Sequence, residues 1–209
     1  MTPRYPVYLF DVDGTLVDSA EDICGAILET LEATPLRGLS RECLVRYVGV
    51  ALLDMFQELL PECTPQRHEE LVQTYRRIYF ARGHRATRVF PGVVEALGAL
   101  GGRKATATTK ATSTTRIVLE QFGLAPYFDH VQGTDGFAYK PAPDVILKSL
   151  AALGARPEEC LLVGDSPADM EAGRRAGVSV CAVRYGYGDP ARMAQYKPDF
   201  WVSDLRELV

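Results

Sequence analysis

Short apolar runs rich in β-forming residues alternate with helix-length segments over most of this 209-residue chain. The first run, residues 7–10, is too short for a helix and predicts a buried strand. From residue 90 onward strands and helices alternate, which predicts a parallel sheet with helices on both faces. We therefore expect an α/β fold with a Rossmann-like core. The expected strands are residues 7–10, 104–109, a short segment around Val131, 160–163 and 178–183.

The segment between the first strand and residue 89 has helical periodicity throughout. Ser19 and Asp22 have the spacing of a capping box before the first helix. Ser40 is placed to cap a shorter helix, and Thr64 followed by Pro65 is a typical helix start. Because the first strand belongs to the sheet, this helical unit is an insertion. We expect a core of residues 1–16 plus 89–209 and a helical cap of residues 17–88.

Composition excludes several classes of protein. The chain has 23 basic and 27 acidic residues and a net charge of −4, so nothing attracts it globally to nucleic acid or to an anionic membrane. No apolar run approaches the roughly 18 residues that span a bilayer, and the apolar stretch near the N-terminus is too short for a signal peptide. The five cysteines form no CxxC pair. They resemble buried apolar residues in a reducing compartment, so we expect a cytoplasmic protein without nucleic-acid or membrane partners.

Arginine is concentrated in one acid-free window, residues 71–94. The window contains His84 and the arginines Arg76, Arg77, Arg82, Arg85 and Arg88. One interpretation is a solvated, salt-bridged helix face followed by a linker. The other is that Arg82 or Arg85 steers anionic phosphate esters toward a binding cleft.

Acidic and polar side chains follow three of the expected strands, where ligands bind in parallel sheets. Asp11 and Asp13 follow the first strand, Thr108 lies at the end of the strand at 104–109, and Asp165 and Asp169 follow the strand at 160–163. Lys140, before Pro141, precedes a helix. Four carboxylates in one cleft repel one another unless a cation offsets their charge. Oxygen ligands favour Mg²⁺, which binds alongside phosphate, and a carboxylate in such a site can attack phosphorus as a nucleophile.

Other interpretations of these residues are weaker. The DxDG motif could begin an EF-hand, but Leu16 stands where that loop requires glycine and a strand precedes it. Asp165 and Asp169 could be helix caps, and Lys140 alone could be a solvated lysine. The joint spacing of all these residues favours a site.

In these motifs the chain resembles the phosphatases of the haloacid dehalogenase superfamily, and within them the phosphoglycolate phosphatase-like branch with a helical cap inserted after the first strand. The resemblance covers essentially the whole chain. It is carried by residues 10–19 (FDVDGTLVDS), residues 90–93 (FPGV), residues 108–110 (TTK), Lys140 with Pro141, and Gly164-Asp165 with Asp169. The family commonly has asparagine where this chain has Thr109, which keeps the backbone donor but lacks the amide.

The resemblance implies a role for each matching residue. Asp11 is implied as the nucleophile, and Asp13 as general acid and then general base. Thr108 is implied to hydrogen-bond the transferring phosphoryl group, and Lys140 to offset the charge on Asp11 and the phosphate. The implied Mg²⁺ ligands are Asp11, Asp165 and the backbone carbonyl of Asp13, with Asp169 acting through water. The implied phosphate-binding groups are Thr108, Lys140 and backbone N–H groups near Val12, Asp13, Gly14 and Thr109.

The expected function is Mg²⁺-dependent hydrolysis of a small phosphorylated metabolite, with 2-phosphoglycolate the best single candidate. A phosphomutase or a pyrophosphatase-like enzyme would share the same core residues. A regulatory module that binds phosphate without turnover would be expected to lack Asp11 or Asp13. The cap would close by hinges at 16–20 and 85–90 and present Arg46, Tyr47 and Gly49 to the substrate. The expected assembly is a monomer or a homodimer.

Overall fold

A computed structural model describes residues 3–209 of the chain. It contains two compact units, Ser19–Thr87 and a larger unit made of the described residues up to Asp18 together with Arg88–Val209. The observed limits differ slightly from the expected 17–88 because Val17–Asp18 (β2) and Arg88–Val89 (β3) form a two-stranded antiparallel ribbon. That ribbon belongs to the larger unit.

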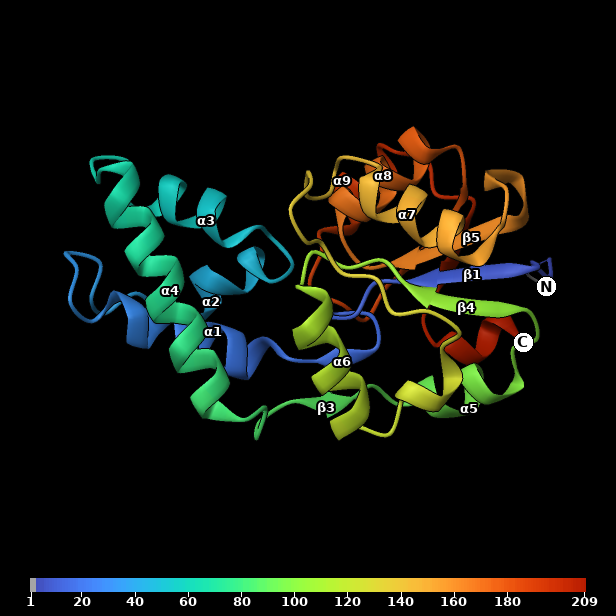
Figure 1. Cartoon of the computed structure of the whole chain (residues 1–209), viewed down its shortest axis with the longest axis horizontal. Coiled ribbons are helices and arrows are strands. Elements are labelled where there is room, and N and C mark those ends of the chain that lie inside the picture. Colours follow the sequence, from blue (N-terminus) through green and yellow to red (C-terminus); the bar gives the residue numbers. More distant parts are fainter. Residues whose placement is uncertain (1–2) are drawn as a thin grey trace. The chain divides into compact units, whose positions relative to one another are not determined.

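The larger unit is built on a five-stranded parallel sheet (Figure 1). In spatial order its strands are β4 (Arg103–Thr106), β1 (Val7–Phe10), β5 (Cys160–Gly164), β6 (Ser179–Val183) and β7 (Phe200–Val202). The register places Leu9 of β1 beside Ala105 of β4 and Leu162 of β5. The expected parallel sheet is confirmed.

Helices cover both faces of this sheet because successive strand residues point to opposite sides. Tyr8 and Phe10 of β1 belong to one hydrophobic cluster, and Val7 and Leu9 belong to the other. The first cluster is completed by α5 (Val93–Ala99), α6 (Thr112–Gln121) and the 3-10 helix η4 (Leu205–Leu208). The second is completed by α7 (Asp144–Leu153), α8 (Pro167–Ala176) and α9 (Pro190–Ala194). Two further 3-10 turns are η2 (Ala125–Tyr127) and η3 (Pro157–Glu159).

The structure corrects two strand predictions. No strand forms around Val131; His130 makes one isolated bridge to Ala105. The next backbone groups, those of Gln132, bond to a side chain and not to a strand. The Thr106 hydroxyl accepts from the Gln132 N–H at 2.8 Å and donates to the Gln132 carbonyl at 2.9 Å. The strand expected at 104–109 ends at Thr106, and the next carbonyl, that of Ala107, accepts a hydrogen bond from Lys140 at 3.0 Å. Strand β7 and helix α9 were not predicted.

The smaller unit consists of helices, as its periodicity predicted. Its elements are α1 (Ala20–Leu31), α2 (Arg41–Leu44), the 3-10 turn η1 (Val45–Tyr47), α3 (Leu52–Leu59) and α4 (Pro65–Arg82). Helix α4 packs against α1 and α3. The Thr64 hydroxyl caps α4 by accepting the N–H of Arg67 at 3.2 Å, whereas the side chain of Ser40 makes no capping bond to α2.

The predicted capping box at the start of α1 is wrong. The Ser19 side chain makes no capping hydrogen bond. Oδ2 of Asp22 instead accepts the backbone N–H groups of Ala86 and Thr87, at 3.0 and 2.8 Å, and the Thr87 hydroxyl at 2.8 Å. Asp22 thus joins the first turn of α1 to the last residues of the same unit. Within residues 3–209, no helix is both long and apolar enough to cross a membrane.

Candidate active site

Asp11 lies at the carboxyl end of the central strand β1. Strand β1 pairs with β4 on one side and β5 on the other, so the loops after all three strands meet there. The chain passes from β1 to β4 and then crosses to β5, which makes this end of β1 the switch point where ligands bind in such sheets. The strand-end residues predicted from the sequence are therefore brought together.

Three carboxylates form a buried cluster. Asp11, Asp165 and Asp169 each offer one oxygen, and these oxygens all lie within 4.8 Å of one another. The Lys140 ammonium lies 2.8 Å from Oδ1 of Asp11 and 2.5 Å from Oδ1 of Asp169. Its side chain is only 4% exposed, so Lys140 is a member of the site and not a solvated surface lysine.

The cluster perturbs the ionisation of its members. Burial raises the pKa of Asp11 to about 6, against the lowering effect of Lys140. Burial, together with the charges of Asp11 and Asp169, raises the pKa of Asp165 well above its usual range. Burial alone would lower the pKa of Lys140, but Asp11 and Asp169 raise it above its usual range. Lys140 therefore keeps its proton, while Asp11 and Asp165 ionise less readily than exposed aspartates.

This donor set fits a divalent cation. One ammonium charge does not balance three buried carboxylates, and burial together with the neighbouring carboxylates raises the pKa values of Asp11 and Asp165. A hard cation that accepts oxygen ligands would restore the balance. Asp11, Asp165 and Asp169 are the residues placed to hold it.

Asp169 combines a structural contact with its place in the cluster. Its Oδ2 accepts the Ser166 hydroxyl at 2.6 Å and the Ser166 N–H at 3.0 Å, which forms the capping box of α8. Its other oxygen, Oδ1, faces Lys140. The helix-cap interpretation is thus correct for one oxygen of Asp169 and leaves the other for the site.

Asp13 has a partner that the sequence did not reveal. Its Oδ2 lies 3.2 Å from the Lys110 ammonium. Lys110 directly follows Thr108 and Thr109 in the chain, and its place in that motif was the available signal. Thr108 is 1% exposed, and Thr109 Oγ1 is buried without a hydrogen-bond partner among the described residues.

Gly14 differs from its expected role. Its N–H donates to the Val17 carbonyl at 2.9 Å, so in this structure it is not available to a phosphate oxygen. Its φ is +87°, and a Cβ at this position would lie 2.2 Å from Oδ2 of Asp165. Glycine is required here for a left-handed turn in close contact with the cluster.

The three expected cap residues lie in the smaller unit. The Arg46 guanidinium donates to the Tyr47 hydroxyl at 2.6 Å and to Glu58 Oε1 at 2.9 Å, and the Tyr47 hydroxyl donates to the same oxygen at 2.8 Å. Gly49 has a φ of +84° and open space where a Cβ would stand. Their contact with substrate stays a prediction.

In the arginine window, the structure favours the salt-bridged interpretation for Arg82. Its guanidinium forms ion pairs with Asp22, at 3.5 Å, and with Glu29. Both partners lie in the same helical unit, so the charge of Arg82 is largely offset there. Steering by Arg85 stays a prediction.

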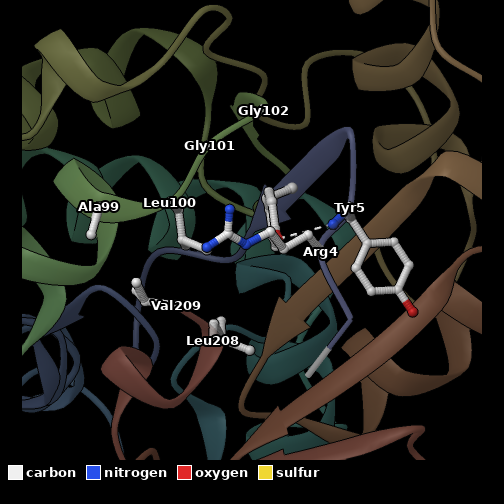
Figure 2. A pocket seen from close by; sticks show the side chains of 9 residues that line it. Arg4, Tyr5, Ala99, Leu100, Gly101, Gly102, Leu208 and Val209 are labelled. Carbon is white, nitrogen blue, oxygen red and sulfur yellow. Dashed lines mark hydrogen bonds between the residues drawn. The ribbon is translucent and has the colours of Figure 1, made fainter. Parts of the chain in front are cut away.

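A separate small pocket lies at the opposite end of β1 (Figure 2). It has a volume of about 110 Å³ and is lined by Arg4, Tyr5, Tyr8, the turn of residues 99–102 and the C-terminal Leu208 and Val209. None of these residues belongs to the carboxylate cluster. The pocket is therefore not part of the candidate active site.

Comparison with known proteins agrees with this geometry. Residues 8–183 match the family described as haloacid dehalogenase-like hydrolase. A phosphoglycolate phosphatase from Aquifex aeolicus is 34% identical over 207 residues, which cover 97% of this chain and 94% of the relative. Pyrophosphatase PpaX from Halalkalibacterium halodurans is 34% identical over 205 residues, 96% of this chain and 94% of the relative. A haloacid dehalogenase-like hydrolase structure from Bacteroides fragilis superposes with a TM-score of 0.92 at 29% identity, covering 99% of this chain and 100% of that one.

The chain belongs to the haloacid dehalogenase-like hydrolase family. Its whole-length similarity to phosphatases makes it a phosphatase within that family.

Proposed function

We propose that the chain is a Mg²⁺-dependent phosphomonoesterase that acts on a small phosphorylated metabolite through a covalent intermediate on Asp11. The observation that carries the proposal is the position of Asp11. It lies at the end of the central strand, 2.8 Å from the Lys140 ammonium and within one cluster with Asp165 and Asp169. Lys140 offsets part of the negative charge around this nucleophile, and Asp165 and Asp169 are placed to hold the cation that would offset the rest.

In the proposed reaction, a carboxylate oxygen of Asp11 attacks phosphorus and the bond to the ester oxygen breaks. Asp13 gives its proton to that leaving oxygen. Asp13 then takes a proton from a water molecule, which attacks the phosphorus of the aspartyl phosphate and releases inorganic phosphate with Asp11 regenerated. Lys140 holds Asp11 in place and offsets the charge that gathers on the phosphoryl oxygens.

The remaining strand-end residues hold the phosphoryl group. Thr108 and the backbone N–H groups near Val12, Asp13 and Thr109 are the proposed donors. The buried, unpartnered hydroxyl of Thr109 supports a second donor at that position. Bound Mg²⁺, with Asp11, Asp165 and the Asp13 carbonyl as ligands and Asp169 acting through water, would supply further compensation of charge on the phosphate.

The best single substrate candidate is 2-phosphoglycolate, supported by similarity along the whole chain to the phosphatase from Aquifex aeolicus. Pyrophosphate is the second candidate, because the relative named pyrophosphatase PpaX has the same 34% identity. A phosphomutase remains the alternative that shares the core residues. The monomeric or homodimeric state and the cytoplasmic location are also part of the proposal.

A substrate screen tests this function. Phosphorylated metabolites, sugar phosphates and pyrophosphate are each incubated with the protein in Mg²⁺ or in EDTA, and both free phosphate and isomerised products are measured. We expect Mg²⁺-dependent phosphate release, fastest with 2-phosphoglycolate, and none from Asp11→Asn. Retained turnover in Asp11→Asn would refute the mechanism, and an isomerised sugar phosphate would identify a mutase.

A further inference from the structure

One residue after the end of β6, the chain has the sequence Tyr185-Gly186-Tyr187-Gly188, and we call this segment the tyrosine strap. We propose that the strap is a positioning element that holds the carboxylate of Asp165 for Mg²⁺. This inference rests on the proposed metal centre and extends it to residues outside the carboxylate cluster. The strap makes two kinds of contact with Asp165 and is anchored at two further points.

The first contact is a hydrogen bond to the Asp165 carboxylate. The backbone N–H of Tyr187 donates to Oδ2 of Asp165 at 2.8 Å. On the other oxygen, Oδ1, the Thr15 hydroxyl lies at the longer distance of 3.4 Å. The strap thus supplies the shorter of these two bonds, and a fixed N–H orients the plane of the carboxyl group.

The second contact is close packing by the two glycines. A Cβ on Gly186 would lie 2.2 Å from Cβ of Asp165, and a Cβ on Gly188 would lie 2.0 Å from its carbonyl oxygen. Neither glycine has a positive φ, so backbone conformation does not require them. Glycine is required at both positions because the strap lies directly against Asp165. Any side chain there would displace either the strap or Asp165.

The two tyrosines anchor the strap to the segment that follows Asp13. The Tyr187 hydroxyl donates to Oδ1 of Asp18 at 2.6 Å, and the Tyr185 hydroxyl donates to the Thr15 carbonyl at 2.8 Å. Burial raises the pKa of Tyr185 above its usual range, which keeps that donor protonated. The strap therefore links the Asp165 loop to the loop after β1, and the two loops carry three of the proposed ligands.

Two strap variants, two controls and Asp165→Asn are compared by calorimetric titration of the metal-free protein with Mg²⁺. Tyr187→Phe removes the hydroxyl that donates to Asp18 and is expected to weaken Mg²⁺ binding by roughly tenfold, as loss of an outer-shell partner does. Gly186→Ala pushes on Asp165 directly, and we expect roughly 100-fold weaker binding. Turnover of Tyr187→Phe should recover as the Mg²⁺ concentration is raised, because a positioning defect weakens metal binding before it affects chemistry.

Two variants are matched controls. Tyr196→Phe removes a similar hydroxyl bond, to Glu171 at 2.7 Å, outside the cluster. Gly101→Ala places a Cβ in open space at a glycine without positive φ. Both should bind Mg²⁺ within about twofold of the parent protein. Thermal unfolding in EDTA identifies any variant that fails to fold. If Gly186→Ala fails to fold, Tyr187→Phe alone still decides the test.

The outcomes separate the strap from the metal centre. If the parent protein binds Mg²⁺ and Asp165→Asn does not, the metal centre stands; Tyr187→Phe with the parent's affinity would then overturn the strap alone. If the parent protein itself does not bind Mg²⁺, the proposed metal centre fails and the strap proposal fails with it.

Discussion

The ammonium nitrogen of Lys110 lies 3.2 Å from Oδ2 of Asp13, and the two side chains are 9% and 7% exposed. A buried ion pair is costly to break, because the remaining partner is left as an uncompensated charge. In the proposed reaction Asp13 must stay directed at the leaving oxygen. The Lys110 ammonium donates to Oδ2 both when Asp13 is ionised and when its other oxygen carries the proton, so we assign Lys110 the role of holding Asp13 there.

Lys110→Met should therefore impair proton transfer more than binding. For an alkyl phosphate, whose leaving oxygen needs a proton, we expect kcat to fall about 100-fold, within the usual contribution of a general acid. For p-nitrophenyl phosphate, whose leaving group needs no proton, the fall should be about tenfold or less. Steady-state kinetics with both substrates measures the difference.

Two further variants complete this comparison. Lys110→Arg keeps the positive charge and should retain part of the activity. Lys148→Met removes an exposed lysine of α7 and should behave as the parent protein. If kcat of Lys110→Met falls equally with both substrates, Lys110 does not act through the general acid Asp13.

Asp22 should stabilise the helical unit, since one of its oxygens accepts three hydrogen bonds from Ala86 and Thr87. Asp22→Ala leaves the buried N–H of Thr87 and the half-buried N–H of Ala86 without this acceptor, and we expect the free energy of unfolding to fall by about 3 kcal/mol. Glu21→Ala is the neighbouring control. Glu21 pairs with Arg41 at the surface, with side chains 50% and 45% exposed. Glu21→Ala should therefore lower the free energy of unfolding by less than about 1 kcal/mol. Urea denaturation of both variants checks the prediction, which equal losses would contradict.

Without metal, the folded protein should lose stability as the pH rises from about 4 to 6. The pKa of Asp11 is raised from 3.8 to about 6 in the folded state. Between these values the folded state binds more protons than the unfolded state, so the free energy of unfolding falls with rising pH. Above pH 6 both states are ionised and the full cost, roughly 3 kcal/mol for this carboxyl, is present.

Unfolding in EDTA across this pH range, for the parent protein and Asp11→Asn, measures that contribution. The variant has no carboxyl to ionise at this position, so its stability should fall less steeply between pH 4 and 6. Asp54→Asn, at an exposed position on α3, is the control and should follow the parent protein. Parallel curves for parent and Asp11→Asn would contradict the assignment.

The sequence predicted those parts of the site that follow from strand order. Asp11 and Asp165 follow apolar strands, Thr108 lies at the end of the strand expected at 104–109, and the carboxyl ends of parallel strands meet at one edge of a sheet. The pairing of Asp13 with Lys110 was not predicted, because a motif gives the spacing of residues but not the direction of their side chains.

Local sequence patterns also did not predict contacts between segments that lie far apart in the chain. The carboxylate of Asp22 matched a local capping box, yet its partners lie 64 and 65 residues further along. The bond from Tyr187 to Asp18 joins residues 169 positions apart. A strand was predicted around Val131, but the backbone N–H and carbonyl of Gln132 bond to the Thr106 side chain and not to a neighbouring strand. Tertiary contacts decided each of these cases against the local preference.

Trapping of the covalent intermediate tests the central claim most directly. Asp13→Asn should still be phosphorylated by p-nitrophenyl phosphate in Mg²⁺, because this leaving group needs no acid, but it should hydrolyse the intermediate slowly. Acid quenching followed by peptide mass spectrometry should then find one phosphoryl group on Asp11, formed together with a burst of p-nitrophenol. A phosphoryl group on another residue, or nitrophenol release without any adduct, would contradict nucleophilic catalysis by Asp11.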